Sequence, residues 1–167
     1  FGLIEQIAGT NRAFDTGRIV SIQSQRESEG SPDIVNMHGG FDYVIGGQGG
    51  DEINIGTGGG AILGDNGQID IDPTTQQWVQ VATRNSQFGG GDTITAGGGA
   101  TFVFGGSAGD VITTAGGDDV IAGDQGVLTF ASGVRSLFTS SIETSAYGGD
   151  DIVKTGAGND WVILGDG

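Results

Sequence analysis

The chain has 167 residues, including 36 glycines, 2 prolines and no cysteine, and its formal net charge at neutral pH is −15. Such an excess of carboxylates disfavours nucleic acid as a partner, because phosphate contacts need Lys and Arg, and it disfavours an anionic membrane surface. The absence of cysteine excludes disulfides, thiolate metal sites and cysteine nucleophiles. No apolar run approaches the length of a membrane span, so we expect no membrane insertion.

Residues 1–32 come before most of the repetitive sequence and contain three of the six basic residues. We predict that they form an excursion, meaning a segment that leaves a repeat array and returns to it. Two later segments have the same character.

A nine-residue period then occupies three blocks, at residues 28–63, 87–122 and 146–163. Its clearest copy is GGQGGDEIN, residues 46–54, in which one slot in nine is aspartate. All ten copies have Val or Ile two residues after this slot, and eight have glycine two residues before it. Aspartate fills eight of the ten slots, while Gly60 and Thr101 fill the other two. The slot aspartates are Asp33, Asp42, Asp51, Asp92, Asp110, Asp119, Asp151 and Asp160.

The residue types of the repeat explain how it folds. Clustered glycines permit tight turns and let carbonyl groups crowd together, while the β-branched residue favours a short strand that points into a core. A turn and a short strand cannot bury an apolar side alone, but stacked copies can. The period therefore predicts an all-β fold of stacked coils.

The repeat resembles the Gly-Gly-x-Gly-x-Asp-x-aliphatic-x nonapeptide of the RTX, or haemolysin-type, calcium-binding family. Residues 46–54 match it at every defined position, and the ten copies cover 90 of 167 residues. The resemblance implies a right-handed parallel β-roll, a β-solenoid in which two nonapeptides form one coil. It also implies that Ca²⁺ lies between turns eighteen residues apart, held by the slot aspartates and backbone carbonyls, and that the protein is extracellular, either secreted or on a cell surface.

Two long interruptions divide the array. Residues 64–92 align without gaps over residues 123–151, an offset of 59, and alternating apolar residues in both predict β-hairpin excursions. The chain thus forms a single array, 1–167, with modules 1–67, 68–126 and 127–167. If the roll continues through the excursions, one edge contains Asp33, Asp51, Asp92, Asp110 and Asp151. The other edge then contains Asp42, Gly60, Thr101, Asp119 and Asp160, and every excursion leaves on the way from this edge to the first.

Other acidic and polar residues were weighed for chemistry. Asp65, Asp124 and Asp166 follow glycine where excursions begin, and they are candidates either for the first edge or for structural turns. The doublets at 118–119 and 150–151 suggest a carboxylate dyad, but the repeat phase already explains one member of each. The single histidine, His38, has no serine framed as a nucleophile, and no Gly-Lys-Ser/Thr follows the glycine strings. We therefore predict that the chain is not an enzyme.

The sequence thus predicts a calcium-dependent extracellular structural repeat protein. Its two ends together complete the Gly-Asp-x-Gly motif that opens each excursion, which suggests head-to-tail self-association into a filament, adhesin or surface layer. One alternative is the calcium-binding RTX domain of a larger secreted protease, lipase or epimerase. Another is a carbohydrate- or ice-binding face, although the residues directly after the slots form no Thr or Asn ladder.

Overall fold

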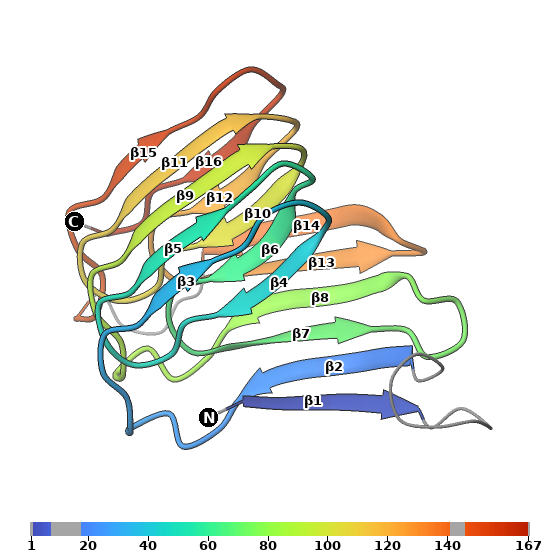
Figure 1. The fold of residues 1–167 in the computed structure, drawn as a ribbon, viewed down its shortest axis with the longest axis horizontal. Helices are drawn as coiled ribbons and strands as arrows, with labels where there is room; N and C mark the ends of the chain where they lie inside the picture. The colour runs from blue at the N-terminus through green and yellow to red at the C-terminus, as the bar shows by residue number, and fades with distance from the viewer. Residues whose placement is uncertain (1, 8–17, 141–145, 167) are drawn as a thin grey trace.

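The computed structural model describes residues 2–7, 18–140 and 146–166, and these residues contain strands and turns but no helix. This confirms the predicted all-β class. The strands form three sheets stacked as layers, which we name the outer, middle and hairpin sheets (Figure 1).

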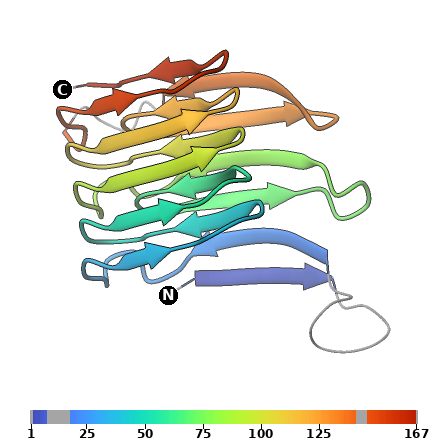
Figure 2. The ribbon, with the colours of Figure 1, turned by 45° about the horizontal axis from the view of Figure 1, so that its top comes forward.

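The outer and middle sheets are parallel and take alternate strands of the nonapeptide blocks. The outer sheet contains β3 (Ile34–Asn36), β5 (Glu52–Ile55), β9 (Thr93–Gly98), β11 (Val111–Gly116) and β15 (Ile152–Lys154). The middle sheet contains β4 (Asp42–Ile45), β6 (Gly60–Leu63), β10 (Thr101–Phe104), β12 (Val120–Ala122) and β16 (Trp161–Ile163). One strand from each sheet makes one coil, and the coils stack along the molecule (Figure 2).

The stacking continues across the excursions. Ile53 pairs with Val35 of the preceding coil and with Ile94 of the following one, although a hairpin separates Ile53 from Ile94 in the sequence. In the middle sheet Ile62 pairs in the same way with Val44 and Val103. The aliphatic column of the repeat therefore sets the register of both parallel sheets.

The excursions form the hairpin sheet, which is antiparallel. Its strands, in spatial order, are β1 (Gly2–Ile7), β2 (Arg18–Ser24), β7 (Gly67–Ile71), β8 (Trp78–Thr83), β13 (Gly126–Ala131) and β14 (Val134–Ser140). Two hydroxyls link successive hairpins at equivalent positions. The N–H of Gly67 donates to Ser24 Oγ at 3.1 Å, and the N–H of Gly126 donates to Thr83 Oγ1 at 3.0 Å.

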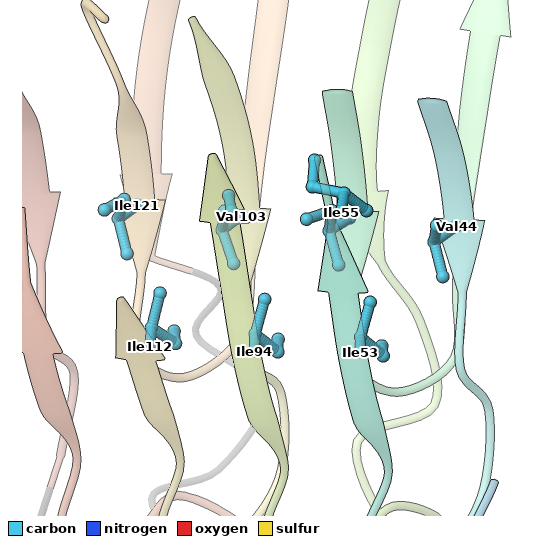
Figure 3. Packing of buried hydrophobic residues seen from close by; sticks show 9 residues of the cluster. Val44, Ile53, Ile55, Ile94, Val103, Ile112 and Ile121 are labelled. Atoms are coloured by element: carbon cyan, nitrogen blue, oxygen red, sulfur yellow. The ribbon is translucent and has the colours of Figure 1, made fainter. Parts of the chain in front are cut away.

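Two hydrophobic cores lie between the three layers. The first core fills the space between the outer and middle sheets with one or two aliphatic side chains per strand, several of which are labelled in Figure 3. The second core lies between the middle and hairpin sheets and holds larger side chains, among them Leu63, Ile69, Phe104 and Leu128.

Close stacking of the coils makes some turn glycines irreplaceable. Gly40 and Gly58 occupy equivalent turns of successive coils, and both have positive φ, at 108° and 130°. A Cβ added to Gly58 would lie 2.2 Å from the carbonyl oxygen of Gly40, whereas a Cβ added to Gly40 meets nothing within 4 Å. Of these two, Gly58 therefore combines an unusual backbone conformation with a steric need for glycine, whereas Gly40 has only the former.

We expect Gly40→Ala to cost about 1 kcal/mol of unfolding free energy, because it strains only the backbone. Gly58→Ala should cost about 3 kcal/mol, because it also pushes two coils apart. Urea unfolding of both variants in millimolar calcium measures the difference. Equal losses would contradict the coil spacing described here.

Candidate metal-binding edge

The first edge consists of the turns that lead into the outer sheet, and an aspartate ends each of these turns. We call Asp33, Asp51, Asp92, Asp110 and Asp151 the first-edge column. Each carboxylate after the first accepts a hydrogen bond from the backbone N–H of the column aspartate one coil earlier. The distances from the backbone nitrogen to Oδ1 are 2.8 Å for Asp33 to Asp51, 2.6 Å for Asp51 to Asp92, 2.7 Å for Asp92 to Asp110 and 2.8 Å for Asp110 to Asp151. The structure thus brings together the five aspartates that the sequence placed on one edge.

Four of these five carboxylates have a second oxygen without a hydrogen-bond partner among the described residues. Asp51 and Asp92 are 2% exposed and Asp110 is 0% exposed. Their Oδ2 atoms, and that of Asp151, are buried without a hydrogen bond. A buried acceptor without a partner is costly, so such atoms indicate a missing ligand or a strained site.

A glycine lies against each of these unpartnered oxygens. A Cβ built on the glycine would fall 2.0–2.3 Å from Oδ2 in the pairs Gly46–Asp51, Gly64–Asp92, Gly105–Asp110 and Gly123–Asp151. Only glycine leaves room for the carboxylate at these positions. The same Cβ would also fall 2.1–2.5 Å from a backbone carbonyl oxygen of the next coil, so a carbonyl lies beside each carboxylate; these are the carbonyls of Gly64, Gly105, Gly123 and Leu164.

Burial changes the acid strength of the column. The pKa of Asp92 is raised to about 8 and that of Asp110 to about 9, mainly by burial and to a smaller extent by the neighbouring carboxylates. The pKa of Asp151 rises to about 6 and that of Asp51 also rises, again mainly through burial. At neutral pH Asp92 and Asp110 therefore resist ionisation unless a cation compensates their charge.

The second edge has the same geometry with fewer acids. Thr101 N–H donates to Asp119 Oδ1 at 2.8 Å, and Asp119 N–H donates to Asp160 Oδ1 at 3.1 Å. Asp42 pairs in register with Gly60, which has no carboxylate to offer. The Oδ2 atoms of Asp42 and Asp119 are buried and unpartnered. This edge resembles the first one, but it is interrupted in the middle.

The aspartates that open the excursions have a different role. Asp65 accepts hydrogen bonds from the N–H groups of Gly90 and Ser107, one on each oxygen. Asp124 likewise accepts from Gly149 and Asp166. Each carboxylate joins the start of an excursion to its return and to the next coil. Of the two interpretations left open by the sequence, the structure supports the turn role for Asp65 and Asp124.

The remaining candidates form structural contacts. Asp118 accepts hydrogen bonds from the backbone and side chain of Asn159, at 2.9 and 3.3 Å. The guanidinium of Arg135 lies 4.7 Å from the ring centroid of Trp161. His38 is exposed in a turn. Asp118 thus holds a neighbouring turn rather than facing a second acid as a dyad.

The sequence did not anticipate a polar column on the outward face of the outer sheet. The residues three positions after the first-edge slots align in register there as Asn36, Asn54, Thr95, Thr113 and Lys154. Asn54 Nδ2 donates to Asn36 Oδ1 at 3.1 Å. This column lies two residues beyond the residues directly after the slots, at the next outward-facing position of each strand.

Side chains alone do not assemble a metal cage. Within residues 2–7, 18–140 and 146–166, no three His, Cys, Asp or Glu side chains converge as ligands for one ion. A cation at either edge would therefore need backbone carbonyls beside one or two carboxylates. The same residues include no helix that is long and apolar enough to cross a membrane.

No family model, curated protein or solved structure matches this chain significantly. Its function is therefore inferred from its own residues.

Proposed function

We propose that this chain is a calcium-stabilised extracellular structural repeat module of the RTX type. In this proposal the outer and middle sheets are the two sides of a right-handed parallel β-roll, with the hairpins as excursions along one edge. The alternation of strands between two parallel sheets, in register through every coil, supports this interpretation.

The first-edge column carries the proposal. It repeats one carboxylate per coil, and each of Asp51, Asp92, Asp110 and Asp151 has one oxygen bound to a backbone N–H and one buried oxygen without a partner. Ca²⁺ suits this donor set because it accepts six to eight oxygen ligands in flexible geometry, including backbone carbonyls. Mg²⁺ suits it less, because Mg²⁺ demands a small octahedral site and retains its waters.

The residues would act as follows. Asp33, Asp51, Asp92, Asp110 and Asp151 supply negative charge along the first edge, and Asp42, Asp119 and Asp160 supply it along the second. The glycine turns hold the carboxylates one coil apart and bring backbone carbonyls beside them, whose remaining lone pairs would complete the coordination. A bound calcium ion supplies the positive charge that offsets repulsion between successive carboxylates. Ion binding and coil stacking therefore become linked.

The proposal extends to location and assembly. An extracellular setting provides the millimolar calcium that weak, multi-carbonyl sites need. Head-to-tail self-association is supported by the end strands β3, β4, β15 and β16, each of which has a sheet neighbour on one side only among the described strands. The alternative, a calcium-binding domain of a larger secreted enzyme, would bind calcium at the same first-edge column.

Removing charge from the two edges should affect calcium binding unequally. We expect Asp92→Asn to raise the calcium concentration at half-saturation by about tenfold, because Asp92 lies between two neighbouring column carboxylates. Asp42→Asn, whose neighbour is Gly60, should raise it by less than about threefold. Asn retains the oxygen that accepts the backbone hydrogen bond, so the substitution changes mainly the charge. Isothermal titration calorimetry measures both values.

Asp72→Asn is the matched control, because Asp72 lies in an exposed hairpin turn where it accepts hydrogen bonds from Thr74 and Thr75. It should leave calcium binding unchanged. If the unmodified protein takes up no calcium at millimolar concentration, the proposal is wrong. Equal effects of the Asp92 and Asp42 substitutions would contradict a continuous first-edge column.

A further inference from the structure

The outer sheet is held on one face only. Its outward side chains include Ile34, Val111 and Ile152, which are 72%, 38% and 54% exposed, and no other described layer covers them. On its inward face its three central strands contribute one or two side chains each to the first core, namely Ile53, Ile55, Ile94, Ala96 and Ile112. Each of these strands therefore has a small apolar contact area with the rest of the molecule.

The middle sheet is held on both faces. Its inward side chains fill the first core, and its opposite face packs on the hairpin sheet through the second core. Leu63 and Phe104 from the middle sheet and Ile69, Val81 and Leu128 from the hairpin sheet are all 0% exposed. Ring contacts add to this packing, since Phe104 stacks on Phe138 with centroids 6.0 Å apart. Large apolar side chains without ionisable groups hold this interface together.

The carboxylates are distributed unequally between the two parallel sheets. Each of the five outer-sheet strands begins directly after a first-edge aspartate. In the middle sheet, the strands β6 and β10 begin at Gly60 and Thr101, which carry no charge. In the absence of a cation, burying these carboxylates is therefore unfavourable at the junctions of the outer sheet, whether they are ionised and repel one another or are kept neutral by protonation. These junctions belong to a layer that packs on one face only.

We propose that calcium docks the outer sheet onto a scaffold that does not need it. At low calcium, the middle and hairpin sheets remain packed through the second core, while the outer strands lose their backbone pairing. Calcium at the first edge neutralises the carboxylates and returns the outer strands to the first core. This inference rests on the proposed function, because it assumes that the first-edge column binds calcium.

Hydrogen–deuterium exchange with peptide-level mass spectrometry tests the proposal on the full chain, in calcium and in excess chelator. Amides of β5, β9 and β11 should exchange about a hundredfold faster in chelator. Amides of β7, β8, β10 and β13 should change by less than about threefold. Calorimetry on the same sample reports calcium uptake independently.

The outcomes are distinguishable. If no calcium binds, both the proposed function and this inference are wrong. If calcium binds and all three sheets gain protection together, the proposed function survives and this inference is overturned. Calcium binding with protection gained only in the outer sheet supports both.

Two variants separate the layers further. Asp92→Asn should increase exchange in the outer sheet in the presence of calcium and leave the hairpin sheet unchanged. Leu128→Ala, in the second core, should increase exchange in the hairpin and middle sheets even in chelator. If Leu128→Ala affects exchange only when calcium is present, the second core does not act as a calcium-independent scaffold.

Discussion

Raising the pH should strongly destabilise the calcium-free protein. Between pH 5 and pH 9 in chelator, we expect the free energy of unfolding to fall by several kcal/mol, as an order of magnitude. The groups responsible are the buried carboxyls of Asp65, Asp92, Asp110 and Asp151, whose pKa values in the folded protein are raised to about 7, 8, 9 and 6. Urea unfolding at fixed pH values across this range measures the effect.

The direction follows from proton linkage. An aspartate in the unfolded chain titrates near pH 4, so above that pH the unfolded state has lost protons that the folded state still holds. The folded state then binds more protons, and its stability decreases as pH rises until the folded pKa is passed. The stability that the protonated, buried carboxyls contribute is therefore fully present below about pH 4. It is lost progressively between about pH 4 and pH 9.

Two controls make the pH result specific. In Asp110→Asn the side chain cannot ionise, so the free energy of unfolding should depend less on pH above about pH 7. At pH 9 in chelator this variant should be more stable than the unmodified chain. Calcium competes with protons for the same oxygens, so the calcium concentration at half-saturation should fall as pH rises. Stability that increases with pH in chelator would show that the column carboxylates are not buried as described.

The nine-residue period predicted the first edge well, because one physical requirement places each residue in it. A coil of two nonapeptides must present Val or Ile to the core at each pass, and Ile53 and Ile94 pair directly even though a hairpin separates them. Once these aliphatic residues align, the aspartates two positions earlier must align too. The same logic predicted that Asp42 would face Gly60.

Periodicity could not predict which hydrogen bonds the two carboxylate oxygens of each aspartate make. The backbone hydrogen bond from Asp51 to Asp92 and the unpartnered Oδ2 of Asp92 depend on turn geometry, and the spacing contains no information about that geometry. The two roles of buried aspartate, in the column and at Asp65, look alike in the sequence. They differ only in where the second oxygen finds a donor.

The nine-residue repeat also could not predict the second core. Phe102 and Phe104 flank Val103, and by alternation they point away from the first core, so they would be expected to face solvent. Nothing in the period reveals that a layer of hairpins covers that face. The alternating residues of the excursions predicted hairpins, but not the packing of Trp78 against Phe102, whose ring centroids lie 5.4 Å apart.

Phe104→Ala should produce the largest loss of stability among single substitutions in the second core. Phe104 is 0% exposed and stacks on Phe138 of the hairpin β13–β14. Replacing a fully buried Phe with Ala removes its transfer free energy and leaves a cavity, which together cost about 4 kcal/mol. Urea unfolding in calcium and in chelator should show this loss under both conditions, because the second core lies away from the carboxylate columns.

Phe41→Ala is the matched control, since Phe41 contacts Tyr43 and Trp78 but is 43% exposed at the rim of the same aromatic cluster. It should cost about 1 kcal/mol, because water already reaches much of the ring and little cavity forms. If Phe104→Ala costs no more than Phe41→Ala, the hairpin sheet does not pack on the middle sheet in solution. If Phe104→Ala lowers the free energy of unfolding strongly in calcium but not in chelator, the second core does not stabilise the metal-free chain.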